Sequence, residues 1–105
     1  MQKESMSQGA LDILNERERQ IFSEGWGPYH DNQHTDGSLV QVAIAYAGSA
    51  IGIPRYQWPQ SWDTKWDKRK RHDRRRKLVI AGALIAAEID RLDMAKACAE
   101  AKAKP

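Results

Sequence analysis

The chain has 105 residues, a length that accommodates one domain and excludes a multidomain enzyme. Hydrophobic residues make up 41% of it and charged residues 30%, a composition typical of a soluble folded domain with a modest core. The net charge of +3 is unevenly distributed, because residues 65–77 hold nine basic and two acidic side chains and the other 92 residues therefore carry −4. The basic character is one local feature of a mildly acidic chain.

Cysteine content and hydropathy indicate the compartment. Cys98 is the only cysteine in the sequence, which excludes an intrachain disulfide and a cysteine-based zinc cluster. The longest uncharged apolar run, residues 78–87, is well short of the roughly 20 residues that cross a bilayer. The first residues are polar and contain no secretion signal. We expect a cytoplasmic protein with no membrane partner.

Apolar periodicity predicts an all-α fold, a small single-domain bundle of about three helices with two long loops. The first helix is expected over about residues 8–23, with an apolar stripe facing the core, and Gly25 should end it. That stripe contains Leu11, Leu14 and Ile21, with Ile13 and Phe22 beside it.

The second helix is expected over about residues 38–50, with Asp36 or Ser38 as its N-cap. It is apolar nearly all round, which predicts a central, buried helix. We expect flexible ends at residues 1–8 and 102–105 and one helical domain over residues 9–101.

The third helix is expected from Asp67 or Asp73 through Ala101. Its interior Gly82 costs about 1 kcal/mol relative to alanine, so we expect a close helix crossing at that position to compensate. The predicted apolar stripe consists of Leu78, Ala81, Ile85, Ile89 and Leu92, and it is broadened by Val79, Ala83 and Leu84.

The loop between the first two helices gathers aromatic and polar side chains. Flat indole and phenol rings beside imidazole, amide and carboxylate groups suit recognition of a polar heteroaromatic ligand. The same residue types also anchor and cap turns, so the structural interpretation stays open. An H-D-x-x-H spacing occurs here, but outside a helix it does not form the zinc-protease signature, and we expect no metal or cofactor. The candidate ligand-binding residues of this loop are Trp26, Tyr29, His30, Asp31, Asn32 and His34.

A second candidate group lies before the third helix. Trp58, Trp62 and Trp66 are spaced four residues apart, so a helical connection would place the three indoles on one face. Arg55 and Tyr56 come just before these tryptophans, and Arg69 comes just after them. The aromatic rings could stack on a base while the arginines hold its phosphates. Alternatively the three tryptophans cap a small core or mediate self-association.

The basic run, residues 68–77, is the third candidate. Such runs attract nucleic acid, an anionic ligand or acidic lipid. The alternative is a solvated helix start, although positive charge opposes the helix dipole there and this conflict favours a bound anion. Arg74 is the residue of this run, besides Arg69, that we assign to ligand phosphates.

Catalytic motifs are missing from the sequence. It contains no G-x-S-x-G, no P-loop and no paired carboxylates with supporting bases. MazG-type nucleotide pyrophosphohydrolases need two acidic helix motifs to hold Mg²⁺, and only Asp90-x-x-Asp93 remotely fits one of them. We therefore expect a protein that is not an enzyme, and keep a relationship to these hydrolases as the third alternative.

Two family resemblances follow from these motifs. The chain resembles a group of small uncharacterised phage and prophage proteins. The resemblance lies in Glu24-Gly25-Trp26, His30-Asp31-x-x-His34 and the segment from Ala81 to Asp93. The chain is also similar to the ryanodine-receptor repeat (RyR) domain. This similarity lies in Glu24-Gly25-Trp26, the loop at 29–32, Leu39-Val40 and Asp73-Arg74. That resemblance implies a small helical module that binds adenine nucleotides or ADP-ribose-like signals.

Together these observations predict a phage-encoded, non-catalytic homo-oligomer that binds a nucleotide-derived small molecule. Such a protein would sequester an immune messenger, for example a cyclic ADP-ribose-like molecule or a cyclic oligonucleotide. The second alternative is a basic accessory protein that binds nucleic acid or a host protein.

Overall fold

The computed structural model describes residues 6–25, 35–53 and 58–103. In these ranges the chain forms three α-helices, α1 (Gln8–Phe22), α3 (Ser38–Ala50) and α4 (Arg74–Ala103), and no strand. Two 3₁₀ turns, η2 (Thr64–Trp66) and η3 (Arg69–Arg71), lie in the connection before α4. The all-α prediction is confirmed, and the helix bounds agree closely with those expected from periodicity.

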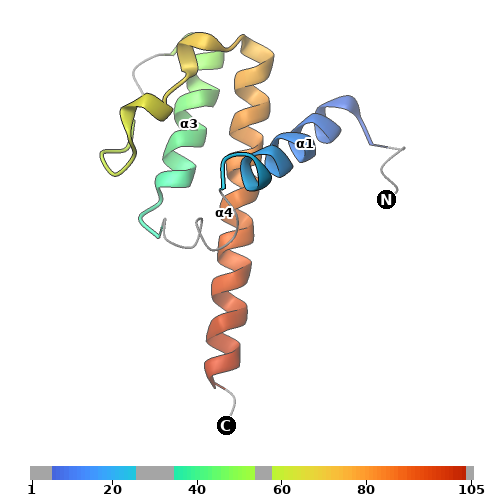
Figure 1. Cartoon of the computed structure of the whole chain (residues 1–105), viewed down its shortest axis with the longest axis vertical. Coiled ribbons are helices and arrows are strands. Elements are labelled where there is room, and N and C mark those ends of the chain that lie inside the picture. Colours follow the sequence, from blue (N-terminus) through green and yellow to red (C-terminus); the bar gives the residue numbers. More distant parts are fainter. Residues whose placement is uncertain (1–5, 26–34, 54–57, 104–105) are drawn as a thin grey trace.

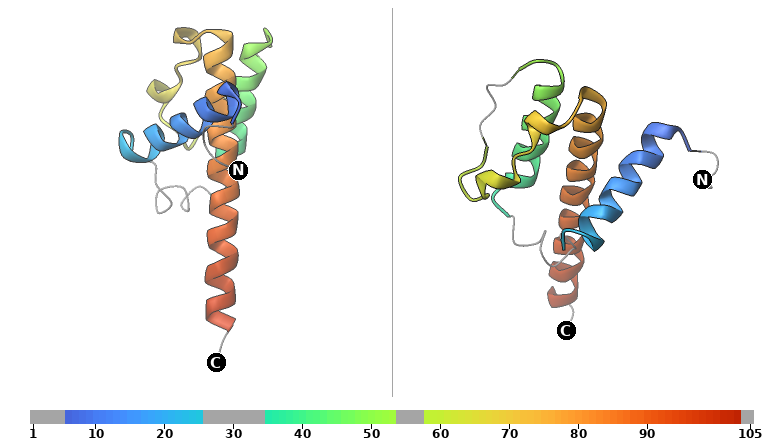
Figure 2. Two further views of the ribbon diagram at one scale, coloured as in Figure 1. Left: turned by 90° about the vertical axis from the view of Figure 1, so that its right-hand side faces the viewer. Right: turned by 45° about the horizontal axis from the view of Figure 1, so that its top comes forward.

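Helices α3 and α4 lie side by side and antiparallel, and α1 crosses α4 at a steep angle (Figure 1). The main core lies between α3 and α4 and is closed at one side by the connection before α4. The second half of α4 extends beyond the other helices, as Figure 1 and the left-hand view of Figure 2 show. The core side chains are Leu39, Val42, Ala43, Tyr46, Trp62, Ile80, Ala81, Leu84 and Ala87.

Helix α3 is largely buried, as its composition predicts, with eight of its 13 residues buried, but Val40 and Ile44 are exposed. The central position predicted for it belongs to α4, which packs against both α1 and α3. Its N-cap is Gly37, at φ 81°, and not Asp36 or Ser38 as predicted. Asp36 still contributes at this end, because its Oδ1 accepts a hydrogen bond from the backbone N–H of Ser38 at 3.0 Å. The glycine provides the left-handed turn that lets the chain enter the helix.

Helix α4 begins after Asp73, the second of the two predicted starts. The Asp73 Oδ1 accepts a hydrogen bond from the backbone N–H of Arg76 at 2.8 Å, which is an N-cap interaction. This carboxylate also places a negative charge at a helix start that is otherwise occupied by cations.

The face of α4 that packs against the core was predicted in part, because Val79, Ala83 and Leu84, which broaden the predicted stripe, are buried while most of its main row is not. Four of the five residues of that row, Leu78, Ile85, Ile89 and Leu92, are 45–53% exposed, and only Ala81 of that set is buried. The core instead takes the neighbouring face, whose sequence is also apolar. Periodicity cannot choose between two adjacent apolar faces of one helix. The buried residues of α4 are Val79, Ile80, Ala81, Ala83, Leu84 and Ala87.

The close helix crossing expected at Gly82 is confirmed. A Cβ atom built on Gly82 would lie 2.8 Å from the Cδ1 atom of Ile13 in α1, closer than real Cβ contacts allow. The missing side chain therefore lets α1 lie directly on α4.

Helix α1 packs on α4 through a mixed face. Its apolar residues Leu11, Ile13, Leu14 and Ile21 are only half-buried, and its fully buried side chains are polar, which the predicted apolar stripe did not include. Its buried residues are Glu16, Arg17 and Gln20, whereas Phe22 is 83% exposed. The reason is that ion pairs fasten α1 to α4, which sequence periodicity does not register. These pairs are Asp12 with Arg75 at 2.7 Å, Arg17 with Asp90 at 3.6 Å, and Glu16 with Arg76.

A search of the described helices found none with the combination of length and apolar content that crossing a bilayer requires.

Candidate functional site

The three tryptophans before α4 converge, although their connection is not an α-helix. A turn closed by the Trp62 N–H and the Pro59 carbonyl at 3.1 Å, followed by η2, brings them together. The ring centroids of Trp58 and Trp62 are 5.9 Å apart, and those of Trp62 and Trp66 are 5.5 Å apart. Both pairs meet edge to face, at 89° and 83°. The sequence thus predicted the grouping and not the backbone that produces it.

Core packing accounts for part of this cluster. Trp62 is 3% exposed and belongs to the core, with Trp58 and Trp66 packed against it. Tyr46 of α3 meets Trp58 edge to face at 6.2 Å. The interpretation that the tryptophans cap a small core is therefore right for Trp62, and the partly buried Trp58 and Trp66 also form a wall.

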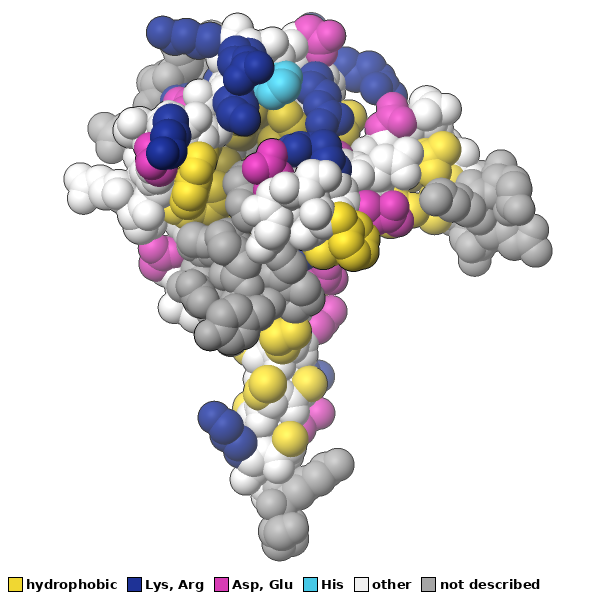
Figure 3. Space-filling model, in the orientation of Figure 1, with side chains coloured by type: hydrophobic (Ala, Val, Ile, Leu, Met, Phe, Trp, Pro, Cys, Tyr) yellow, Lys and Arg dark blue, Asp and Glu magenta, His cyan; other side chains and the backbone are white. Residues whose placement is uncertain are grey.

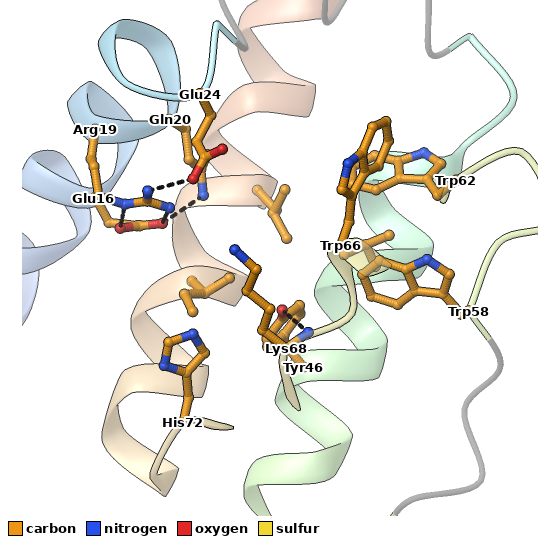
Figure 4. A pocket seen from close by; sticks show the side chains of 13 residues that line it. Glu16, Arg19, Gln20, Glu24, Tyr46, Trp58, Trp62, Trp66, Lys68 and His72 are labelled. Atoms are coloured by element: carbon orange, nitrogen blue, oxygen red, sulfur yellow. Dashed lines mark hydrogen bonds and ion pairs between the residues drawn. The ribbon is translucent and has the colours of Figure 1, made fainter. Parts of the chain in front are cut away.

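That wall faces α1 across a cavity of about 60 Å³, shown in Figure 4. The cavity has room for a few water molecules or the edge of a ring, but not for a whole nucleotide. One side is aromatic, and the opposite side consists of polar residues from the end of α1. Its lining is Glu16, Arg19, Gln20, Glu24, Val42, Tyr46, Trp58, Trp62, Trp66, Lys68, His72, Ile80 and Leu84.

The polar side is organised around Glu16, whose side chain is 1% exposed. Its carboxylate accepts hydrogen bonds from Arg19 at 2.8 and 3.0 Å, from the Gln20 amide at 3.1 Å and from Arg76. Burial alone would raise the pKa of Glu16, but the hydrogen bonds and charges of Arg19 and Arg76 outweigh burial and hold that pKa below its ordinary value. Glu16 is therefore charged at neutral pH.

Gln20 brings an unused acceptor to the cavity wall. The residue is 1% exposed, and its Oε1 atom has no hydrogen-bond partner among the described residues. An unsatisfied buried amide oxygen costs about 1–3 kcal/mol. The sequence analysis missed Gln20, because a glutamine on a charged helix carries no signal that it will be buried.

Lys68 contributes a cation to the same space. Its side chain points between the polar residues of α1 and the tryptophans in Figure 4. Its backbone is fixed, because the Lys68 N–H donates to the hydroxyl oxygen of Tyr46 at 3.1 Å. The nearby His72 has a pKa below its ordinary value, because it is partly buried and lies near the cations Arg76 and Arg71. The cavity thus combines the Lys68 cation, an imidazole whose pKa is lowered, and buried acceptors.

A second, larger hollow of about 410 Å³ adjoins the cavity, and Lys68 lines both. We call it the basic hollow. The end of α3, the connection before α4 and the first turn of α4 enclose it. Figure 3 shows the lysines and arginines gathered at this end of the molecule. The lining residues are Ser49, Thr64, Asp67, Lys68, Arg69, Lys70, Arg71 and Lys77.

The basic run divides into structural and unpaired cations. Arg69 pairs with Asp67 at 2.7 Å and lies 5.8 Å from the Trp58 ring centroid. Arg75 and Arg76 fasten α4 to α1. By contrast, within the ranges the structure describes, no ion pair is formed by Lys68, Lys70, Arg71, Arg74 or Lys77.

The predicted ligand-binding residues therefore fall into three groups. Trp58 and Trp62 line the cavity, and Arg69 lines the basic hollow. Arg74 is exposed as the first residue of α4 and lines neither. The remaining predicted residues lie outside the described residues: Trp26, Tyr29, His30, Asp31, Asn32, His34, Arg55 and Tyr56.

Metal ligands were also sought in the described ranges. There, no three histidine, cysteine, aspartate or glutamate side chains lie close enough together to hold a metal ion. The H-D-x-x-H segment is not part of those ranges.

Comparison with known proteins adds no relative. A scan against protein-family models, a search of curated proteins and a search of solved structures each found no match to this chain.

Proposed function

We propose that this protein binds, without converting it, a small molecule derived from a nucleotide. The observation that carries the proposal is the tryptophan-walled cavity, which is lined by Gln20, a buried residue whose Oε1 acceptor has no described partner. A nucleobase has a flat apolar face and N–H donors at its edge. The cavity would accept that edge, with its N–H group satisfying Gln20.

The biological consequence follows from the phage resemblance. A phage-encoded protein of this kind would sequester a nucleotide signal of the host's defence, such as a cyclic ADP-ribose-like molecule or a cyclic oligonucleotide. Binding alone is sufficient for sequestration, so the proposal requires no catalytic group.

We also propose that the protein acts as a homo-oligomer. The radius of gyration is 15.0 Å, against about 13 Å for a compact chain of this length, because the second half of α4 extends beyond the other helices. Ile85, Ile89 and Leu92 are about half exposed there and follow the three- and four-residue spacing of a helix-pairing seam. Light scattering should give a mass of at least two chains, which Ile89→Lys should reduce to one.

Calorimetric titration with nucleosides, nucleotides, ADP-ribose and cyclic dinucleotides tests the ligand proposal. We expect one ligand class to bind with measurable heat and to raise the melting temperature. Gln20→Met should weaken that binding about tenfold, the value of one hydrogen bond to a buried acceptor. Gln60→Met, at an exposed position, is the matched control.

Lys68→Met supplies a second variant in case Gln20→Met unfolds. It removes the cation from the cavity and keeps the backbone bond to Tyr46. Absence of heat and of a thermal shift with every compound would refute the proposal.

A further inference from the structure

Most of the cationic side chains that line the basic hollow form no ion pair with a described residue. In the described part of the chain the lining of this hollow has five cationic side chains and one carboxylate, Asp67. Arg69 neutralises that carboxylate with hydrogen bonds of 2.9 and 2.7 Å. The other four cations form no ion pair with a described residue. Like charges around one hollow repel one another, and an anion would relieve that repulsion.

The helix end that borders the hollow is partly capped, because two of its last four carbonyl groups accept hydrogen bonds from the chain that follows. The carboxyl end of a helix normally presents unsatisfied carbonyl oxygens, which disfavour negative charge. At the end of α3, the Gly48 carbonyl accepts hydrogen bonds from the N–H groups of Ile51 and Ile53 at 3.1 and 2.9 Å. The Ser49 carbonyl accepts one from Gly52 at 3.1 Å. These carbonyl dipoles are therefore already satisfied.

Size and position indicate which anion fits. A hollow of about 410 Å³ lies in the range of small-molecule sites. Lys68 lines this hollow and the tryptophan cavity, so one ligand can reach both. The 92 residues outside 65–77 carry a net charge of −4, which disfavours a long nucleic-acid footprint.

We infer that the basic hollow is a polyphosphate subsite, in which Lys70, Arg71 and Lys77 hold at least two phosphate groups of one small molecule, while the Lys68 ammonium lies toward the adjoining tryptophan cavity. This assignment differs from the sequence prediction, which gave the phosphates to Arg55, Arg69 and Arg74. The polyphosphate subsite rests on the proposed function in one respect, namely that the same ligand carries a ring whose edge enters the tryptophan cavity.

Inorganic triphosphate is the first probe, used with the full chain at fixed ionic strength. We expect it to bind by calorimetry and to raise the melting temperature more than sodium chloride of equal ionic strength does. The double variant Lys70→Ala/Arg71→Ala changes two exposed residues and should weaken triphosphate binding at least tenfold.

The matched control is Lys96→Ala/Lys102→Ala, which removes the same charge from exposed positions far along α4 and should change the affinity less than twofold. Equal losses in both double variants would overturn the inference, because net charge alone would then explain binding. Displacement of triphosphate by a more tightly bound 20-base-pair DNA duplex would also overturn it, in favour of nucleic acid.

Adenosine and adenosine triphosphate separate this inference from the proposed function. Tighter binding of the triphosphate, lost in Lys70→Ala/Arg71→Ala, supports both. Equal binding of the two compounds, unchanged in that variant, overturns the polyphosphate subsite and leaves the proposed function standing. In a third outcome, inorganic triphosphate binds, adenosine does not, and adenosine triphosphate binds no more tightly than inorganic triphosphate. That outcome supports the polyphosphate subsite and counts against the aromatic cavity as a site for a base.

Discussion

Glu16 of α1 accepts a hydrogen bond from the guanidinium of Arg76 in the first turn of α4, 60 residues further along the chain. The carboxylate is buried, while the Arg76 side chain is 37% exposed. This bond ties α1 to α4 beside the apolar contact of Ile13 with Gly82. It also holds in place the polar wall of the tryptophan cavity.

Replacing Glu16 by glutamine should therefore destabilise the fold. The amide cannot serve as the acceptor for Arg19, Gln20 and Arg76 together, so buried donors lose their partner. Breaking a fully buried ion pair costs roughly 3–5 kcal/mol, and the partial exposure of the arginines lowers our expectation to about 2–3 kcal/mol. Urea denaturation measures the change. Glu18→Gln, an exposed position on the same helix, should stay within about 0.5 kcal/mol of the parent.

The same carboxylate predicts how stability depends on pH. Its pKa in the folded protein is lower than the ordinary value of 4.5, so the unfolded chain binds the proton more tightly. The stabilisation by Glu16 is complete well above pH 4.5 and is lost as the pH falls through its lower, folded pKa. Urea midpoints between pH 7 and pH 3 should fall more steeply for the parent than for Glu16→Gln. Parallel curves would show that Glu16 does not titrate as described.

Within the basic run, neighbouring residues should differ in their effect on folding. Arg76→Ala removes a partner of buried Glu16 and should cost about 1–3 kcal/mol. Lys70→Ala, at an exposed position without a described ion pair, should cost no more than about 0.5 kcal/mol. Chemical denaturation of the two single variants gives the comparison, and equal costs would contradict the division of the run.

At the helix crossing, Gly82 and Ile13 should show energetic coupling. Alanine at position 82 gains about 1 kcal/mol of helix propensity, but its Cβ would lie 2.8 Å from the Ile13 Cδ1 atom. Gly82→Ala should therefore stabilise the protein in an Ile13→Ala background and give a smaller gain, or a loss, in the parent. A double-mutant cycle by urea denaturation measures this coupling. Additive changes would show that the two helices are not in contact there.

Tyr46→Phe tests the hydroxyl that fixes the Lys68 backbone. Burial raises the pKa of the Tyr46 phenol, which stays protonated and accepts the Lys68 N–H at 3.1 Å. Removing the hydroxyl leaves that N–H without its acceptor and should cost about 1 kcal/mol. The ring remains to pack against Trp58, so near-ultraviolet circular dichroism of the aromatic cluster should change little. A loss of that signal would show that the hydroxyl also holds the cluster together.

Sequence reasoning predicted the helices well because their bounds depend on local chemistry. Gly25, the capping Asp73 and the apolar content of α3 act within a few residues of the positions that they determine. The crossing at Gly82 was predictable for a similar reason, since a glycine within a helix needs a compensating contact.

The candidate site could be predicted only in part. Trp58 and Trp62 were expected from residue type, but the turn that joins them to Trp66 depends on tertiary packing. Gln20 reaches the cavity because α1 docks with this polar residue buried, and Lys68 reaches it because its backbone is held by Tyr46 of α3. That docking depends on ion pairs between residues about 60 positions apart, such as Arg75 with Asp12 and Arg76 with Glu16. No pattern along one helix contains this information.

The basic run at 68–77 both joins α4 to α1 and lines the basic hollow, and these two roles limit what charge-removal experiments can show. Neutralising the whole segment, a common first test for a nucleic-acid or phosphate binder, would also release α1 from α4 through Arg75 and Arg76. The resulting loss of binding would report an undocked helix and not an emptied anion site. Only substitutions restricted to Lys70, Arg71 and Lys77 separate the two causes, because their cations surround the hollow without joining the helices.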